Sequence, residues 1–196
     1  MLKIQTIPVG MLQTNCYVAW LEGRADCLIV DSGDNARKII TFLESHSLTP
    51  AAILLTHGHF DHDGAVKDLA LEYDCPVYMN KKELILPSGF PTGRRAYTHS
   101  CGEGEVLALA GMQLQVLETP GHTPGSVCYL TGSTLFSGDT LFAGSCGRTD
   151  FPCGSWSTMM ESLRRLANLP GDYTVYPGHG EPTTLDNERK YNPYFR

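Results

Sequence analysis

Short apolar segments in the first part of the chain predict strands with two helices between them. Segments rich in Ile, Val, Tyr and Trp predict strands at residues 2–8, 15–21 and 27–31. Apolar residues three and four positions apart predict a helix at 35–46, whose buried face is Ala36, Ile39, Ile40 and Leu43. Residues 51–55 are continuously apolar, as in a strand buried on both faces. A second helix is predicted to begin near Gly64, followed by a strand at 75–79.

The pattern changes after a predicted loop at 87–104. Short turns that contain glycine join strands predicted at 106–109, 112–117, 126–130 and 133–137. A helix predicted at 157–168 has a capping box, Thr158-x-x-Glu161, and a buried face made of Met160, Leu163 and Leu166. A last strand is predicted at 173–176.

The chain therefore has two halves, each made of strands followed by helices. Strand–helix alternation could give one doubly wound parallel sheet. The hairpin-like spacing between residues 106 and 137 does not suit an all-parallel sheet, because antiparallel neighbours need only short turns. Two mixed sheets packed face to face, with helices outside, suit it better. Because no linker or repeat interrupts residues 1–196, a single domain is expected.

Composition and charge narrow the class of protein. The chain of 196 residues is 42% hydrophobic and 18% charged, which is typical of a globular domain with a sizeable core. Its net charge of -6 argues against a nucleic-acid partner. No apolar run is long enough for a membrane span, and the beginning does not resemble a signal peptide. Seven scattered cysteines without a C-x-x-C pair suggest reduced thiols, so a cytoplasmic location is expected. The sequence does not set the oligomeric state.

A cluster of metal-binding residue types directly follows the apolar run at 51–55. His57 and His59 are two positions apart in an extended segment, so both side chains can point to the same side. If the chain then turns into a helix, Asp61 and His62 occupy its first turn and face the same place. Three imidazoles and a carboxylate within six residues are a strong signal for a metal site.

Three more candidate ligands share one context. His122 follows the strand that ends at 117, Asp139 follows the next hairpin, and His179 follows the last strand. Each lies in a loop where glycine lets the backbone bend sharply. Any one of them alone would more often be structural. Their common placement at strand ends, where such sheets hold their sites, favours a shared metal centre.

Together these residues resemble the motif set of the metallo-β-lactamase superfamily. The resemblance runs from about residue 10 to residue 184. Within it, the segments at 13–17, 119–125 and 144–152 resemble the glyoxalase II branch, and more closely its short single-domain bacterial members. The resemblance implies an α/β protein with a four-layer αββα sandwich, in agreement with the two halves described above.

The resemblance also implies two metal ions and a division of the ligands between them. The first ion would be held by His57, His59 and His122. The second would be held by Asp61, His62 and His179, with Asp139 bridging both. Zinc is expected, with iron or manganese as alternatives. Two divalent ions, two carboxylates and a bridging hydroxide leave a net charge of about +1, which suits an anionic substrate and the oxyanion of a tetrahedral intermediate.

The expected activity is hydrolysis of a thioester such as S-lactoylglutathione by attack of that hydroxide. Asp61 would also orient the hydroxide. Asp31, at the end of a strand, is either a hydrogen-bond partner of a ligand histidine or a simple turn residue. Arg148 stands where the family has a basic residue that can meet a glutathione carboxylate, but it could equally be a solvated loop arginine. The additional helical domain that gives the long glyoxalase II enzymes most of their glutathione contacts has no counterpart in this sequence.

Three other functions compete with this one. A persulfide dioxygenase resembles the same branch and needs a single iron, which His57, His122 and Asp139 could hold. A lactonase or β-lactamase of the same fold is a second alternative. A metal-binding module without catalysis is a third, although the complete ligand set argues against it.

Overall fold

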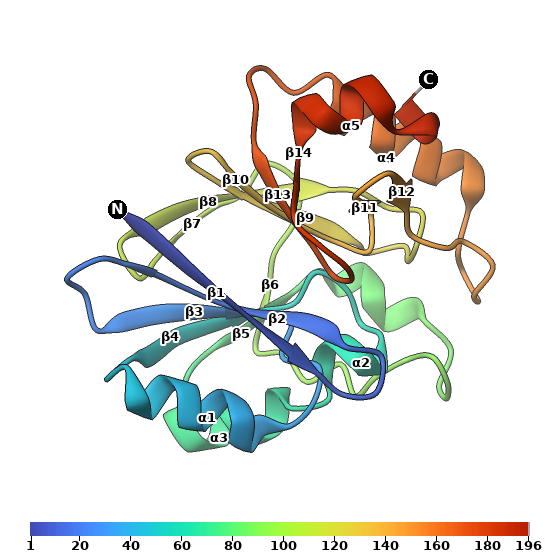
Figure 1. Ribbon diagram of the computed structural model, residues 1–196. Coiled ribbons are helices and arrows are strands. Elements are labelled where there is room, and N and C mark those ends of the chain that lie inside the picture. Colours follow the sequence, from blue (N-terminus) through green and yellow to red (C-terminus); the bar gives the residue numbers. More distant parts are fainter. Residues whose placement is uncertain (196) are drawn as a thin grey trace.

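The computed structural model describes residues 1–195, and its first sheet is built from the first half of the chain. The strand order is β1-β2-β3-β4-β5-β6, with bounds Leu2–Val9, Thr14–Leu21, Asp26–Val30, Thr49–Leu54, Val77–Met79 and His99–Ser100. Helices α1 (Ala36–Ser45) and α3 (Val66–Tyr73) cover its outer face (Figure 1). The one-turn helix α2 (Phe60–Asp63) and the 3-10 helix η1 (Lys81–Ile85) lie between these elements in sequence.

The second sheet is built from the second half of the chain. Its order is β14-β13-β10-β9-β8-β7, with bounds Thr183–Thr184, Thr174–Pro177, Thr134–Gly138, Val127–Thr131, Met112–Glu118 and Val106–Leu109. Helices α4 (Trp156–Ala167) and α5 (Leu185–Tyr191) cover its outer face (Figure 1). A small hairpin, β11 (Leu141–Phe142) and β12 (Ser145–Cys146), and the 3-10 helix η2 (Pro193–Phe195) complete this half.

Both sheets are mixed, as the spacing of the predicted strands indicates. In the first sheet β1, β2 and β3 are antiparallel neighbours, whereas β3, β4, β5 and β6 run parallel. In the second sheet β7 to β10 are antiparallel neighbours, and β13 pairs parallel with β10. The expected αββα sandwich is therefore confirmed, and the single parallel sheet is excluded.

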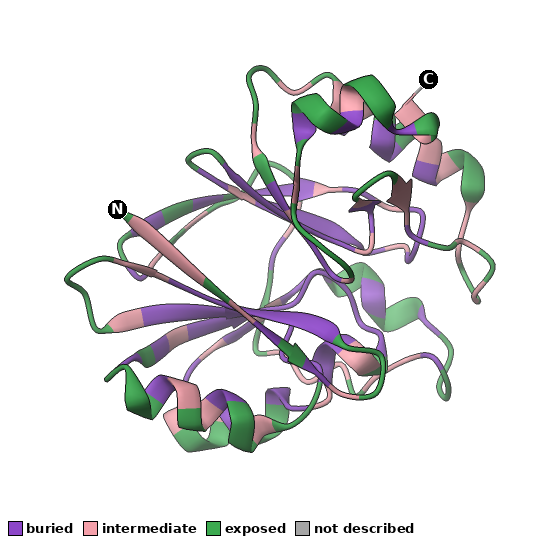
Figure 2. Cartoon of the chain, viewed as in Figure 1, coloured by how far each residue is buried: buried purple, intermediate pink, exposed green. Residues whose placement is uncertain are grey.

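Three apolar clusters hold the four layers together. The central cluster joins the facing sides of the two sheets through large buried residues such as Tyr17, Leu54, Tyr129 and Phe136. The central strands of both sheets are accordingly buried along most of their length (Figure 2). One outer cluster lies under α1 and α3, and the other under α4 and α5. Burying both faces of each sheet is what the continuously apolar strands require.

The start of α4 differs from the prediction. The helix begins at Trp156, and Ser155 is its N-cap, with Oγ accepting a hydrogen bond from Thr158 N at 3.4 Å. The predicted capping box at Thr158 is therefore wrong, because the N-cap lies three residues earlier, and the helix begins one residue before its predicted start at 157. The buried face accordingly includes Met159, whereas Met160 is only partly buried. Within residues 1–195, none of the helices combines the length and the apolar character that a bilayer span needs.

Candidate metal centre

All seven candidate ligands lie in loops at one edge of the sandwich. His57 and His59 follow β4, and Asp61 and His62 lie in α2 directly after them. His122, Asp139 and His179 follow β8, β10 and β13 respectively, three strands of the second sheet that run in the same direction. The loops therefore meet because parallel strands end at the same edge.

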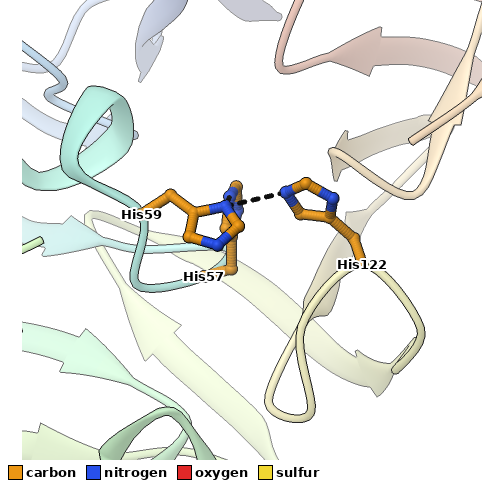
Figure 3. A group of neighbouring side chains, drawn as sticks. All are labelled: His57, His59 and His122. Atoms are coloured by element: carbon orange, nitrogen blue, oxygen red, sulfur yellow. Dashed lines mark hydrogen bonds between the residues drawn. The ribbon is translucent and has the colours of Figure 1, made fainter. Parts of the chain in front are cut away.

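Three histidines form the first group (Figure 3). His57 Nε2 lies 3.1 Å from His59 Nδ1, and His59 Nδ1 lies 2.9 Å from His122 Nε2. All three side chains are almost fully buried. Two nitrogens bound to a tetrahedral zinc at about 2.0–2.1 Å lie about 3.3 Å apart, so this spacing suits a shared ion.

Asp61, His62 and His179 form the second group. His179 Nε2 lies 3.2 Å from Asp61 Oδ2, and His62 Nε2 lies 3.6 Å from the same oxygen. Asp139 lies between the groups, with Oδ1 at 3.4 Å from His62 Nε2 and Oδ2 at 3.5 Å from His122 Nε2. Gly178 permits this approach, because a Cβ there would lie 2.2 Å from Asp139 Oδ1.

The outer ring nitrogens of three histidines are held by neighbouring groups. His122 Nδ1 lies 2.7 Å from the carbonyl oxygen of Arg148, to which it can donate a hydrogen bond. His62 Nδ1 lies 3.0 Å from Asp31 Oδ2, and Asp31 also accepts hydrogen bonds from the backbone N–H and hydroxyl of Thr56. Thr56 Oγ1 donates to Asp31 and so can accept from His57 Nδ1 at 3.1 Å. Such contacts select the tautomer that leaves the inner nitrogen free to bind a metal.

Asp31 therefore acts as the partner of a candidate ligand histidine. Its backbone has φ of 55°, so it also occupies a sharp bend. The two interpretations left open by the sequence are thus both correct in part.

Burial and charge set the protonation of the ligands. Burial, together with the neighbouring His122 and His62, lowers the pKa of His59 to about 3. Burial likewise lowers the pKa of His57 well below its ordinary value. For Asp61, burial acts to raise the pKa, but the hydrogen bond with His179 and the charge of His62 outweigh it and hold the pKa at about 2. Neutral imidazoles and ionised carboxylates are the forms that bind metals. The pKa values of His62 and His179 shift the other way, because burial acts to lower them but neighbouring carboxylates outweigh it and raise them.

Three buried atoms of the candidate ligands have no hydrogen-bond partner of suitable geometry among the described residues. His62 Nδ1 faces Asp31, whereas His62 Nε2 and Asp139 Oδ1 face each other in the centre, 3.4 Å apart. A buried polar atom without a partner costs about 1–3 kcal/mol. A cation between the two atoms would remove this cost, so the residues present fit a metal ion.

The strand β2 fixes the loop that carries His179, a role that the sequence did not reveal. Asn15 Nδ2 donates hydrogen bonds to the carbonyl oxygens of Pro177 at 3.0 Å and Gly180 at 2.8 Å. Tyr17 Oη donates to the same Pro177 oxygen at 2.6 Å. The 13–17 segment, noticed only for its family resemblance, therefore positions the second group.

Glu83, on η1, connects the two loops of the first group. Its side chain is fully buried, and its two oxygens accept hydrogen bonds from the backbone N–H groups of Gly58 and Gly125, both at 2.6 Å. Gly58 lies between His57 and His59, and Gly125 ends the loop that carries His122. Burial raises the pKa of Glu83, whereas these hydrogen bonds act to lower it. No sequence pattern indicated this role, because Glu83 is distant in the chain from both loops.

Arg148 lies beside the centre through its backbone, but its side chain is exposed. The guanidinium donates two hydrogen bonds to Asp150, at 2.7 and 2.6 Å, and lies 3.9 Å from the ring centre of Phe151. Its charge is therefore partly neutralised by a neighbour two residues away.

Comparison with known proteins agrees with this geometry. The family described as Metallo-beta-lactamase superfamily matches residues 9–179. The chain is 34% identical over 208 residues to the hydroxyacylglutathione hydrolase GloC of Haemophilus influenzae, with 98% of both chains covered. Among solved structures it is similar to BLEG-1, described as a B3 metallo-beta-lactamase, with TM-score 0.90, 35% identity and coverage of 98% and 99%. It is also similar to TTHA1623 in a di-iron-bound form, with TM-score 0.86, 37% identity and coverage of 97% and 99%.

Proposed function

This chain belongs to the metallo-beta-lactamase superfamily, and on that basis we propose that it is a dinuclear metal-dependent hydrolase of acyl thioesters. The observation that carries the proposal is the convergence of seven candidate ligands: two groups of three, with Asp139 between them. The name of one relative, a hydroxyacylglutathione hydrolase, and the motif resemblance support a thioester as the substrate.

Each ion is assigned three residues and a shared carboxylate. His57, His59 and His122 would hold the first ion, and Asp61, His62 and His179 the second. Asp139 would contact both, because its carboxylate lies near His122 of the first group and near His62 and His179 of the second. The family binds divalent metals, and the di-iron form of TTHA1623 makes iron as well as zinc a candidate here.

The residues divide the chemical work between them. Two divalent ions would supply Lewis-acid activation of the carbonyl group and a lowered pKa for water, toward about 7. Among the described residues, Asp61 is hydrogen-bonded only through Oδ2, which accepts from Thr14 Oγ1 at 3.0 Å. Its other oxygen, Oδ1, is left to orient the attacking water and hold its proton. The carboxylates of Asp61 and Asp139 also reduce the positive charge of the centre, leaving enough to attract an anionic substrate.

The experiment combines metal analysis with assays of turnover. Purified protein should contain about two ions of zinc, iron or manganese per chain and hydrolyse S-lactoylglutathione. Asp61→Asn keeps the shape of the side chain but removes its charge, so kcat should fall at least about a hundredfold. Metal content must be measured in the same sample. Near-normal turnover in a fully loaded Asp61→Asn variant would contradict the mechanism.

Competing activities and the role of Arg148 are separated by the choice of substrate. If the protein holds a single iron and consumes oxygen with glutathione persulfide, its activity is persulfide oxidation and not thioester hydrolysis. If it hydrolyses a β-lactam or a lactone but no thioester, the proposed thioester hydrolysis is wrong and that activity takes its place. Arg148→Ala should raise KM for glutathione thioesters about fivefold or less, because the side chain is exposed and already paired. An equal effect on an uncharged thioester would show that Arg148 does not bind the glutathione carboxylates.

A further inference from the structure

A small apolar cleft lies beside the candidate metal centre, and none of the contacts described so far uses it. Its volume is about 280 Å³. Met11 and Leu12, from the turn between β1 and β2, line it together with Phe60 of α2 and Phe90. Asp61, assigned above to the second ion, also lines the cleft. The cleft therefore borders the proposed reaction centre at Asp61.

The exposure of these side chains is not explained by the fold. Met11 is 97% exposed and Phe90 is 77% exposed. Turns usually carry Gly, Asn, Asp, Ser or Pro, so two adjacent large apolar residues at a turn are unusual. Apolar side chains gathered at one place on a surface commonly mark a ligand site.

Hydrogen bonds fix the turn beside the centre. Gln13 Nε2 donates to the carbonyl oxygen of Gly10 at 2.7 Å, which closes the turn. Thr14, the first residue of β2, donates to Asp61 Oδ2 at 3.0 Å. Met11 and Leu12 are therefore held next to a proposed metal ligand.

The opposite wall is a chain of aromatic rings that starts at the metal centre. The ring of Phe151 lies 5.7 Å from that of His59, and Phe90 lies 5.8 Å from Phe151. Phe60 lies 5.4 Å from Phe90. Three phenylalanines from separate segments thus pack in a row from a proposed ligand to the cleft, and two of them, Phe60 and Phe90, line it. Phe60 is held in this position because its backbone N–H donates to Pro91 O at 3.0 Å.

We propose that this cleft binds the acyl chain of the thioester, and that the substrates are thioesters of short, uncharged apolar acyl groups. The inference rests on the proposed function. Common thiol carriers such as glutathione are polar and charged, so the acyl chain is the part that an apolar wall can bind. Among residues 1–195, no lysine or arginine lines the cleft, whereas Asp34 and Asp61 do, so an acyl group with a carboxylate is disfavoured.

The size of the cleft limits the length of the acyl chain. Pockets that hold a whole drug-sized ligand occupy about 300–1,000 Å³, so this cleft is suited to one part of a substrate. Each methylene that enters an apolar site gains up to about fourfold in binding. Because the cleft is open to solvent on one side, a gain of about two- to fourfold per methylene is expected until the cleft is full.

The test is a series of thioesters that share one uncharged thiol. Acetyl, butanoyl, hexanoyl and octanoyl esters of N-acetylcysteamine are assayed with the metal-loaded protein. The expected result is that kcat/KM rises about two- to fourfold per methylene and then levels off before octanoyl. Phe90→Ser should flatten this dependence. Leu71→Ser, which alters an equally exposed apolar side chain on α3 away from the centre, should leave it unchanged.

Each other outcome overturns a defined part of the reasoning. Hydrolysis with no dependence on chain length in the unmodified protein would refute the acyl site while leaving thioester hydrolysis intact. The same conclusion follows if Phe90→Ser retains the full dependence. If light scattering instead shows a dimer that Phe90→Ser dissociates, with unchanged selectivity, the cleft is an interface between two copies of the chain. If no thioester is hydrolysed at all, the proposed function is wrong, and the acyl site, which rests on it, is wrong as well.

Discussion

Replacing Glu83 by glutamine tests how the first group of ligands is held together. The glutamate is fully buried, and each of its oxygens accepts one backbone N–H, from Gly58 and Gly125. Glutamine has nearly the same shape but only one acceptor oxygen. Its amide nitrogen would face one of the two N–H groups, so that donor would lose its partner.

The magnitude follows from the two hydrogen bonds. A hydrogen bond to a charged group contributes about 1.5–3 kcal/mol, and a buried donor without a partner costs about 1–3 kcal/mol. Glutamine avoids the cost of burying a charge, which offsets part of the loss. The free energy of unfolding of the metal-free protein should therefore fall by about 2–3 kcal/mol. For a domain of this length that corresponds to a decrease in Tm of about 4–12 °C.

The affinities for the two metal ions provide a second measurement, because general destabilisation would not lower one affinity and leave the other unchanged. Because Glu83 joins only the loops of His57, His59 and His122, the first ion should bind about 10–100-fold more weakly, and the second should change little. Competition with a chromophoric chelator measures both affinities. Glu72→Gln, an exposed substitution on α3, is the matched control. An unchanged Tm, or an equal loss of both ions, would refute the role given to Glu83.

Two further predictions follow from other parts of the structure. Asn15→Ala should lower the affinity for the second ion about tenfold or more and leave the affinity for the first unchanged, because Asn15 supports the loop of His179. Selective loss of the first ion in the chelator assay would contradict this. In the native protein a thiol reagent at pH 8 should modify Cys153 quickly and the half-buried Cys146 slowly. The five buried thiols should react only after unfolding. Burial hides them from the reagent and disfavours the thiolate; it raises the pKa of Cys27, for example, to about 12. Rapid modification of more than two thiols would show that the core opens readily.

The order of strands and helices was largely predictable because it depends on local patterns. The apolar face of α1 and the apolar residues 51–54 of β4 are visible in the sequence, and both elements form where their patterns indicate. Errors appeared at the ends of elements. The N-cap of α4 was misplaced because Ser155 and Thr158 are both good capping residues, and the local pattern does not decide between them. Helix α5 was not predicted, since its buried face consists of only a few residues.

The sequence by itself determined which residues could bind metal, because four of the seven lie within six positions and the others follow strands. Only the tertiary structure decided how they are held. Glu83, Asn15 and Asp31 act across contacts between segments far apart in the chain, and no local pattern records such contacts. The apolar cleft has the same origin, because its walls come from the β1–β2 turn, α2 and the loop of Phe90. The residue types in the sequence identify the candidate metal ligands. The contacts that hold these ligands, and the shape of the cleft beside them, depend on how the two sheets and their loops pack.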